Sequence, residues 1–294
     1  MKERYVEDSK FNTASIKLIR MCDAIITDYG KQGFRLTIRQ LYYQLVARGH
    51  IENTVRSYNN VVGMMTKARL AGLIDWDAIE DRTRDVIQRS HWTSGGALLK
   101  ACAAQYFEDM WEDQDYRVFV MVEKEALAGV LEPICNEWDC PLLPARGYPS
   151  ATTLREFAKQ RILNSHQQIV VLHLGDHDPS GMDMSRDLAE RLSLFARERV
   201  YIDFRRIALN MDQVEEQQPP PNPAKVTDTR FDKYQEQFGD ESWELDALSP
   251  TYLHELVSTQ VAGLVDMERW DACTAKIENV RERLSTIAED FDKE

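Results

Sequence analysis

The stretch from Gln168 to Gly181 reads QIVVLHLGDHDPSG, and it decides the fold class. Its first seven residues are an apolar run of the length expected for a buried strand. Pro179 and Gly181 then turn the chain sharply into a segment with helical periodicity, over about 181–196. A buried strand that leads directly into a helix is one half of a βαβ unit.

Two further apolar runs of strand length flank this stretch, Arg117–Val122 (RVFVMV) and Tyr201–Leu209 (YIDFRRIAL). Helical periodicity follows the first run over about 124–137 and closes the chain over about 250–263 and 266–291. Strands that alternate with helices predict a largely parallel sheet. Residues 217–224 (QQPPPNPA) are too rich in proline for a helix or a central strand, so we expect a rigid loop there.

The N-terminal third has a different pattern, with helical periodicity over about 13–29, 38–47 and 54–71. Thr37 followed by Gln40 is a capping-box pattern at the start of the second helix. Three short helices with a basic third one are typical of helix-turn-helix and winged-helix modules. A possible hinge at Thr93–Gly96 precedes a further helix over about 97–112. We therefore predict an α/β protein with an N-terminal, helical, winged-helix-like domain over 1–95. A domain over 96–294 follows, with a Rossmann-like parallel sheet and C-terminal helices.

Composition places the 294-residue chain in the soluble, globular class, because 43% of its residues are hydrophobic and 29% are charged. No apolar run reaches the length of a membrane span, and the first ten residues lack the apolar core of a signal peptide. The five cysteines have scattered spacing, which supports neither a zinc cage nor a disulfide framework. We expect a cytoplasmic protein with reduced thiols and no membrane association.

Charge is distributed unevenly along the chain. The net charge is −13, which argues against non-specific nucleic-acid binding by the molecule as a whole. Residues 1–90, however, contain 15 basic and 11 acidic residues, a net charge of +4, so the remainder carries −17. Within 31–70 seven basic residues stand against one acidic residue. This local excess is expected of a module that contacts phosphates, and a solvated helix face is the alternative interpretation.

Carboxylates follow two of the predicted strands at the point where each strand ends. Glu123 comes directly after the first, and Asp176 and Asp178 come directly after the second. Adjacent parallel strands bring their carboxyl ends to one edge of a sheet, so we expect the three side chains to converge. Carboxylates packed that closely repel one another unless a cation binds, and a hard divalent ion such as Mg²⁺ suits oxygen ligands. The alternative for Asp178 is a cap on the following helix.

The order of these motifs resembles the Toprim domain of topoisomerases, primases and certain nucleases. Val122-Glu123-Lys124, Gly147–Thr153 (GYPSATT) and Asp176–Gly181 resemble the version found in the A subunit of type IIB topoisomerases (topoisomerase VI) and its meiotic break-making relatives. Trp243–Leu248 (WELDAL) resembles the late segment of these domains less specifically. The resemblance implies a Mg²⁺ site, with Mn²⁺ as an alternative metal, made by Glu123, Asp176 and Asp178 and acting on a DNA phosphodiester.

The segment Thr37–Tyr43 (TIRQLYY) resembles the Arg-acid-x-Tyr-Tyr signature of the type IIB cleavage domain, with Gln40 at the position of the acid. That domain is a winged helix whose second tyrosine attacks DNA. At about 100° per residue, Leu41, Tyr42 and Leu45 share the apolar stripe of Ile38. Arg39 and Tyr43 lie off that stripe and form an i, i+4 pair.

We therefore expect Tyr42 to be packed and Tyr43 to be presented outward beside Arg39. A nearby cation lowers the cost of forming a phenolate, so Arg39 either activates Tyr43 or holds the scissile phosphate. The alternative is that both tyrosines pack in an amphipathic helix. Glu123 joins Arg39 and Tyr43 as a predicted catalytic residue. The predicted DNA contacts are Lys124, Arg146, Arg56, Lys67 and Arg69, with solvated charges as the alternative.

The leading hypothesis is a Mg²⁺-dependent DNA-cleaving enzyme that acts by tyrosine transesterification. The resemblance implies a homodimer in which the tyrosine of one subunit works with the metal site of the other. The chain has no ATPase signature, so ATP-driven strand passage would require a separate ATPase subunit. Two alternatives stay open: a Toprim nuclease that hydrolyses DNA with activated water, and a non-catalytic dimeric DNA-binding protein.

Overall fold

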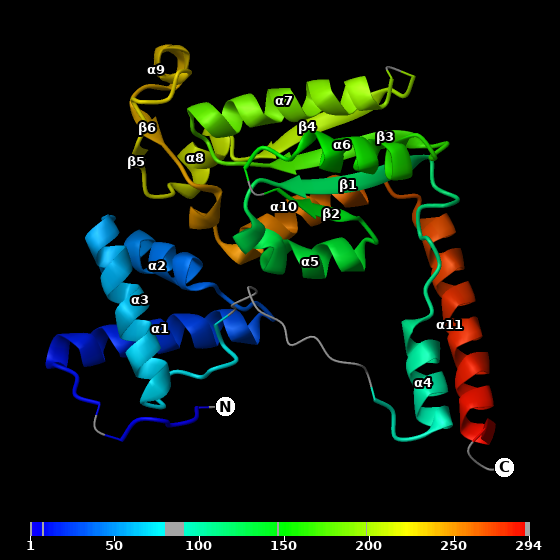
Figure 1. Cartoon of the computed structure of the whole chain (residues 1–294), viewed down its shortest axis with the longest axis horizontal. Helices are drawn as coiled ribbons and strands as arrows, with labels where there is room; N and C mark the ends of the chain where they lie inside the picture. Colours follow the sequence, from blue (N-terminus) through cyan, green and yellow to red (C-terminus); the bar gives the residue numbers. More distant parts are fainter. Residues whose placement is uncertain (1, 8, 80–90, 146, 198, 292–294) are drawn as a thin grey trace.

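The computed structural model describes residues 2–7, 9–79, 91–145, 147–197 and 199–291 (Figure 1). A parallel sheet with helices on both faces forms one part of the molecule, and three N-terminal helices form a second part beside the carboxyl edge of the sheet. The α/β class predicted from the sequence is confirmed. None of the helices in the described part of the chain has the length and apolar character that a membrane span needs.

The parallel sheet contains the three predicted strands and one that was not predicted. Its order is β2-β1-β3-β4, with all neighbours parallel. The strands are β1 (Tyr116–Val122), β2 (Leu142–Pro144), β3 (Gln168–Leu174) and β4 (Ile202–Ala208). β1 and β3 are adjacent and in register, with Val122 opposite Leu174, so the carboxylates that follow them start from the same edge.

Alternate residues of the central strands serve two cores, which is why the strands read as continuous apolar runs. Val118, Val120 and Val122 pack with α5 (Ala128–Glu137) and α10 (Pro250–Ala262) on one face. Phe119 and Met121 pack on the other face, with α6 (Ala151–Phe157) and α7 (Pro179–Phe195). A one-turn helix, Glu125–Leu127, precedes α5, and a π-helical turn, Ala158–Ile162, continues α6.

The N-terminal helices are α1 (Thr13–Lys31), α2 (Ile38–Ala47) and α3 (Val55–Leu70), which confirms the three predicted helices. The capping box at α2 is present: Thr37 Oγ1 accepts from Gln40 N, and Gln40 Oε1 accepts from Thr37 N. The helices share an apolar core of their own, to which Ala247 of the sheet-bearing part adds. The segment 80–90, where a wing would follow, lies outside the described residues.

The remaining elements frame the sheet and its edge. They are α4 (Gly95–Gln105), α8 (Met211–Gln217), β5 (Asn222–Pro223), α9 (Phe231–Phe238), β6 (Glu241–Ser242), the turn η3 (Leu245–Ala247) and α11 (Met267–Phe291). α4 packs along α11, away from the N-terminal helices (Figure 1). The helix predicted over 97–112 ends at 105, and Ser94, within the predicted hinge, caps α4. Within the proline-rich loop, β5 pairs with β6 in a two-stranded antiparallel sheet.

Candidate active site

Glu123 and Asp176 meet at the carboxyl edge of β1 and β3, as the sequence predicts. Glu123 Oε2 accepts a hydrogen bond of 2.8 Å from the Asp176 backbone N–H. Two glycines allow this approach: a Cβ at Gly175 would lie 3.0 Å from Glu123 Oε2, and a Cβ at Gly181 would lie 2.3 Å from the Asp176 carbonyl oxygen. The loop from 175 to 181 therefore closes tightly over the Glu123 carboxylate.

Asp178 joins the same loop but has a structural role as well. It is the N-cap of α7, and its Oδ1 accepts a 2.6 Å hydrogen bond from Gly181 N. The capping interpretation of Asp178 is therefore confirmed. Asp178 also lies close enough to Glu123 to raise the pKa of that carboxyl, after the larger effect of burial. Asp178 therefore caps α7 and also belongs to the carboxylate cluster, which consists of Glu123, Asp176 and Asp178.

Arg206 of β4, which sequence reasoning missed, stabilises this loop through hydrogen bonds. Its Nη2 donates to the carbonyls of Gly175, Asp176 and Leu209, and its Nη1 donates to Gly181 O and Ser185 Oγ. The side chain is partly buried, so these acceptors replace water around the guanidinium. The sequence gives no signal that singles it out, because the run Tyr201–Leu209 contains three charged residues, Asp203, Arg205 and Arg206.

Lys124 lies at the centre of a second group of charges that sequence reasoning largely missed. Its Nζ is 2.8 Å from Asp176 Oδ1 and 3.1 Å from Asp246 Oδ1, and it also pairs with Glu244. The chain brings these acids in because residue 243 pairs with residue 177 and Leu245 N donates to Asp176 Oδ1. The Asp246 side chain is only 1% exposed and that of Glu244 is 28% exposed, so these two acids of the segment Trp243–Leu248 face the interior of the site.

Arg39 joins the tyrosine-bearing helix to the same acids. It forms ion pairs of 2.7 Å with both Glu244 and Asp246, and its guanidinium lies 5.9 Å from the Tyr43 ring centroid. The expected pairing of Arg39 with Tyr43 is therefore present. We call Arg39, Lys124, Asp176, Glu244 and Asp246 the ion network, because consecutive ion pairs connect all five.

Tyr43 is not presented outward, which corrects the sequence expectation. It is only 5% exposed, and Tyr42 is similarly buried at 4%. Helix geometry did place Tyr43 off the apolar stripe, but Asn222 and Glu244 from the sheet-bearing part cover that side of α2. Tyr43 lines a pocket of about 420 Å³ together with these residues and the start of α3. The side chain thus faces the junction between the two parts rather than solvent.

The expectation that Tyr43 loses its proton readily is also corrected. Burial raises the pKa of Tyr43 above its ordinary value of 10.0, and Glu244 and Asp246 add to this effect. Arg39 and a hydrogen bond with Asn222 act in the opposite direction and do not overcome it. In this arrangement the tyrosine is a neutral phenol near neutral pH.

Glu123, Asp176 and Asp178 offer carboxylate oxygens, the ligand type that a hard divalent cation prefers. Burial raises the pKa of Glu123 and raises that of Asp176 to about 8, with Asp178 adding to the shift of Glu123 and Glu123 adding to that of Asp176. Burial and neighbouring negative charge both raise the pKa of a carboxyl group. The described residues nevertheless contain no group of three or more His, Cys, Asp or Glu already arranged to hold a metal. At Asp176, Lys124 Nζ and Leu245 N both engage Oδ1.

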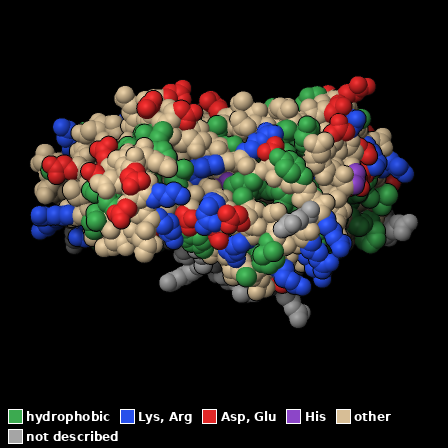
Figure 2. Space-filling model, turned by 90° about the horizontal axis from the view of Figure 1, so that it is seen from above, with side chains coloured by type: hydrophobic (Ala, Val, Ile, Leu, Met, Phe, Trp, Pro, Cys, Tyr) green, Lys and Arg blue, Asp and Glu red, His purple; other side chains and the backbone are tan. Residues whose placement is uncertain are grey.

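The predicted DNA contacts differ in their availability. Arg56 and Lys67 are exposed, and at about 100° per residue they lie on one face of α3 together with the exposed Asn60. Arg69 is instead used internally: it stacks on Trp76 at 4.3 Å and donates to the Trp76 carbonyl. Lys124 is occupied by the ion network, and Arg146 lies outside the described residues. On the face in Figure 2, basic and acidic side chains of the described residues are interspersed.

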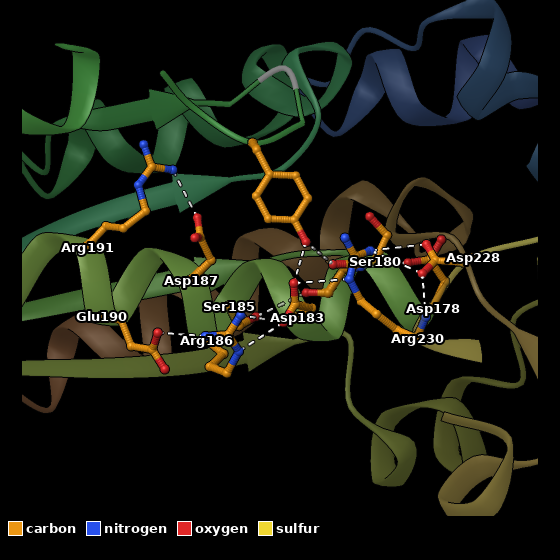
Figure 3. A network of polar contacts seen from close by, with 12 residues as sticks. Asp178, Ser180, Asp183, Ser185, Arg186, Asp187, Glu190, Arg191, Asp228 and Arg230 are labelled. Atoms are coloured by element: carbon orange, nitrogen blue, oxygen red, sulfur yellow. Dashed lines mark hydrogen bonds and ion pairs between the residues drawn. The ribbon is translucent and has the colours of Figure 1, made fainter. Parts of the chain in front are cut away.

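The segment Gly147–Thr153 has a structural explanation. Gly147 has a φ of +75°, and Ser150 caps α6 by accepting from Thr153 N. Tyr148 donates a 2.8 Å hydrogen bond to Asp183 of α7, and Arg230 lies over its ring. Figure 3 shows that Asp183 belongs to a series of ion pairs along α7, next to Asp178. The segment thus connects α6 to the first turn of α7.

Comparison of the sequence with protein-family models gives no match, and comparison with curated proteins gives no significant match. The resemblance to type IIB topoisomerase A subunits therefore rests on the quoted motifs alone.

Proposed function

We propose that this protein is a Mg²⁺-dependent enzyme that cleaves DNA by tyrosine transesterification. The observation that carries the proposal is the meeting of Glu123 with the 176–178 loop at the carboxyl edge of two adjacent parallel strands. Ligand and catalytic sites of open α/β sheets lie at this edge. The exposed basic face of α3, with Arg56 and Lys67, supports DNA as the substrate.

Glu123, Asp176 and Asp178 are the residues that would hold the metal. A bound Mg²⁺ would stabilise the negative charge that develops on the phosphate during cleavage. The chain's own groups supply the rest: α3 binds the DNA backbone, and Arg39 positions the tyrosine or the phosphate. Asp176 takes part only after it is released from Lys124.

In the reaction, the Tyr43 oxygen forms a bond to phosphorus, and the bond from phosphorus to the 3′ oxygen breaks. The phenol proton is lost to solvent, and the 3′ oxygen gains a proton to become a free hydroxyl. The protein is then linked to the 5′ end through a phosphotyrosine. Since Tyr43 is buried, DNA binding must first draw α2 away from Asn222 and Glu244. In accord with the resemblance, we propose a homodimer in which each tyrosine serves the partner's carboxylates.

A second candidate is a nuclease that hydrolyses DNA with an activated water. The burial of Tyr43 and its raised pKa favour this candidate, because neither matters if water is the nucleophile. The carboxylate site is common to both candidates, so the two differ only in the nucleophile.

One experiment separates them. Supercoiled plasmid is incubated with the protein and Mg²⁺ or Mn²⁺, and the products are run on a gel with and without protease treatment. Tyrosine transesterification predicts DNA held back by protein until protease is added. Hydrolysis predicts free nicks in both lanes. Binding without cleavage under every metal condition would contradict the proposed enzyme.

Matched variants assign the residues. Tyr43→Phe should abolish protein–DNA adducts, whereas Tyr58→Phe, which alters a tyrosine of the same pocket, should not. Asp176→Asn should abolish cleavage of either kind, whereas Asp187→Asn, in an i, i+4 ion pair on α7, should not. Normal adduct levels from Tyr43→Phe would remove Tyr43 from the mechanism.

A further inference from the structure

We propose that Lys124 sets the affinity of the carboxylate cluster for a divalent cation, because its ammonium competes with the cation for Asp176. This inference rests on the metal site of the proposed function and goes beyond it. It assigns to Lys124 a role other than the DNA contact expected from the sequence. Lys124 becomes a tethered counter-ion that occupies the site until a metal displaces it.

The contacts of Lys124 are those of a cation bound by oxygen ligands. Its ammonium is surrounded by carboxylates of Asp176, Asp246 and Glu244, and its side chain is 17% exposed. An ammonium so far removed from water requires such partners to remain charged.

Lys124 and Glu123 approach Asp176 from two sides. Lys124 has extended backbone angles, φ −108° and ψ 121°, so neighbouring side chains point in opposite directions. Glu123 reaches the Asp176 backbone N–H, while Lys124 reaches the Asp176 carboxylate. Leu245 N donates to the same oxygen that Lys124 engages. A metal that uses this oxygen must replace the ammonium.

The charge balance leaves room for such a replacement. Among the described residues, the cluster and the ion network contain five carboxylates (Glu123, Asp176, Asp178, Glu244 and Asp246) and two cations (Arg39 and Lys124), and the cations Arg206 and Lys225 lie close enough to act on them. With every group counted as ionised the formal sum is −1, so negative charge is in excess before a divalent cation binds. When Lys124 leaves Asp176, its ammonium still has two carboxylate partners, because its ion pairs with Glu244 and Asp246 remain.

The test measures metal binding directly, with the full chain and without DNA. Mn²⁺ affinity is determined by titration calorimetry and by the spin-resonance signal of free Mn²⁺. Lys124→Met keeps most of the length of the side chain without its charge, and it should bind Mn²⁺ at least about tenfold more tightly than the unaltered protein. Lys124→Arg keeps the charge and should show no such gain. Lys100→Met removes an exposed lysine on α4 and should leave the affinity unchanged.

The outcomes separate this inference from the proposed function. If the unaltered protein binds Mn²⁺ and Lys124→Met binds it equally well or more weakly, Lys124 does not compete with the metal and the inference is wrong. If neither protein binds Mn²⁺, the metal site of the proposed function is wrong as well. Lys124→Gln serves as a second neutral variant, and circular dichroism shows that each variant is folded before it is titrated.

Discussion

At the scale of single residues, the Asp176 carboxyl makes a prediction about pH. Burial raises its pKa from 3.8 to about 8, against the opposing effect of Lys124. Between these values the folded protein holds a proton that the unfolded chain has released, so this group favours folding most at the acid end of the window. That contribution is lost as the pH rises towards 8.

Asp176→Asn removes this titration. With a chelator present, we expect the variant to gain free energy of unfolding relative to the unaltered protein as the pH rises from about 5 to about 8. Urea unfolding at several pH values measures the difference between the two proteins, which cancels the effect of groups common to both. A difference that is constant across the window would show that Asp176 does not titrate there.

Sequence reasoning found the residues of the site that follow strands but not those that arrive from elsewhere. Glu123, Asp176 and Asp178 could be placed because adjacent parallel strands end at one edge. Arg206, Glu244 and Asp246 enter through long-range contacts whose register no local pattern encodes. Tyr43 shows the same limit: helical periodicity defines the side that faces its own core, but not whether a distant segment covers the opposite side.

At the scale of elements, the capping box of α2 can be tested by itself. Thr37→Ala removes the acceptor for Gln40 N and leaves that donor without its partner. We expect a loss of about 1 kcal/mol in the free energy of unfolding, the usual cost of losing an N-cap. Thr13→Ala, at the exposed first position of α1, should change stability by less than about 0.5 kcal/mol. Chemical denaturation compares the two, and equal losses would contradict the role of the cap.

The loop between β3 and α7 depends on Gly181. A methyl group there would lie 2.3 Å from a backbone carbonyl, which cannot rotate away as a side chain can. We expect Gly181→Ala to lower the free energy of unfolding by about 1–3 kcal/mol and to displace the 176–178 segment. Gly63→Ala is the matched control, because a Cβ at this position of α3 meets nothing within 4 Å. It should instead stabilise the helix by up to about 1 kcal/mol. Thermal unfolding measures both variants, and a neutral Gly181→Ala would contradict the close approach.

The elements that the sequence predicted well are those with a strong internal pattern. β1 and β3 are buried on both faces, so their apolar runs were unmistakable. β2 has three residues, which is too short for any period to appear. The helix predicted to reach 112 stops at Gln105 because the acidic segment beyond it forms turns. There Asp109 accepts a hydrogen bond from Trp111 N and pairs with Arg117.

At the scale of the whole molecule, the ion network joins the N-terminal helices to the sheet-bearing part, beside the hydrogen bonds of Asn53 with Pro221 and Asn222 and the packing of Ala247. Arg39 is the contribution of α2, and its partners Glu244 and Asp246 lie beside Asp176. The contact of Arg39 with Glu244 and Asp246 therefore lies beside both the buried Tyr43 and the carboxylate site. In a chain with a net charge of −13, a cation placed among several acids offsets the repulsion between them.

Arg39→Met tests this contact. The Arg39 side chain is 42% exposed, so solvent weakens its ion pairs, and we expect a loss of about 1–2 kcal/mol in the free energy of unfolding. Arg56→Met, an exposed arginine on α3, should change stability by less than about 0.5 kcal/mol. The same substitution at 39 should also expose Tyr43, which chemical nitration of tyrosine followed by mass spectrometry detects. Unchanged nitration of Tyr43 would show that Arg39 does not hold the two parts together.

A double-mutant cycle then locates the energy in the contact itself. If Arg39 stabilises the molecule through Glu244, combining Arg39→Met with Glu244→Gln should cost less than the two single changes added together, by about 0.5–1 kcal/mol. Pairing Arg56→Met with Glu244→Gln should be additive, because no ion pair joins those residues among the described contacts. Additivity in both cycles would mean that the ion pair between Arg39 and Glu244 contributes nothing to the docking. The cover over Tyr43 would then come from the other contacts, namely the Arg39–Asp246 ion pair, the hydrogen bond with Asn222 and the packing around Ala247, and DNA would need to separate those instead.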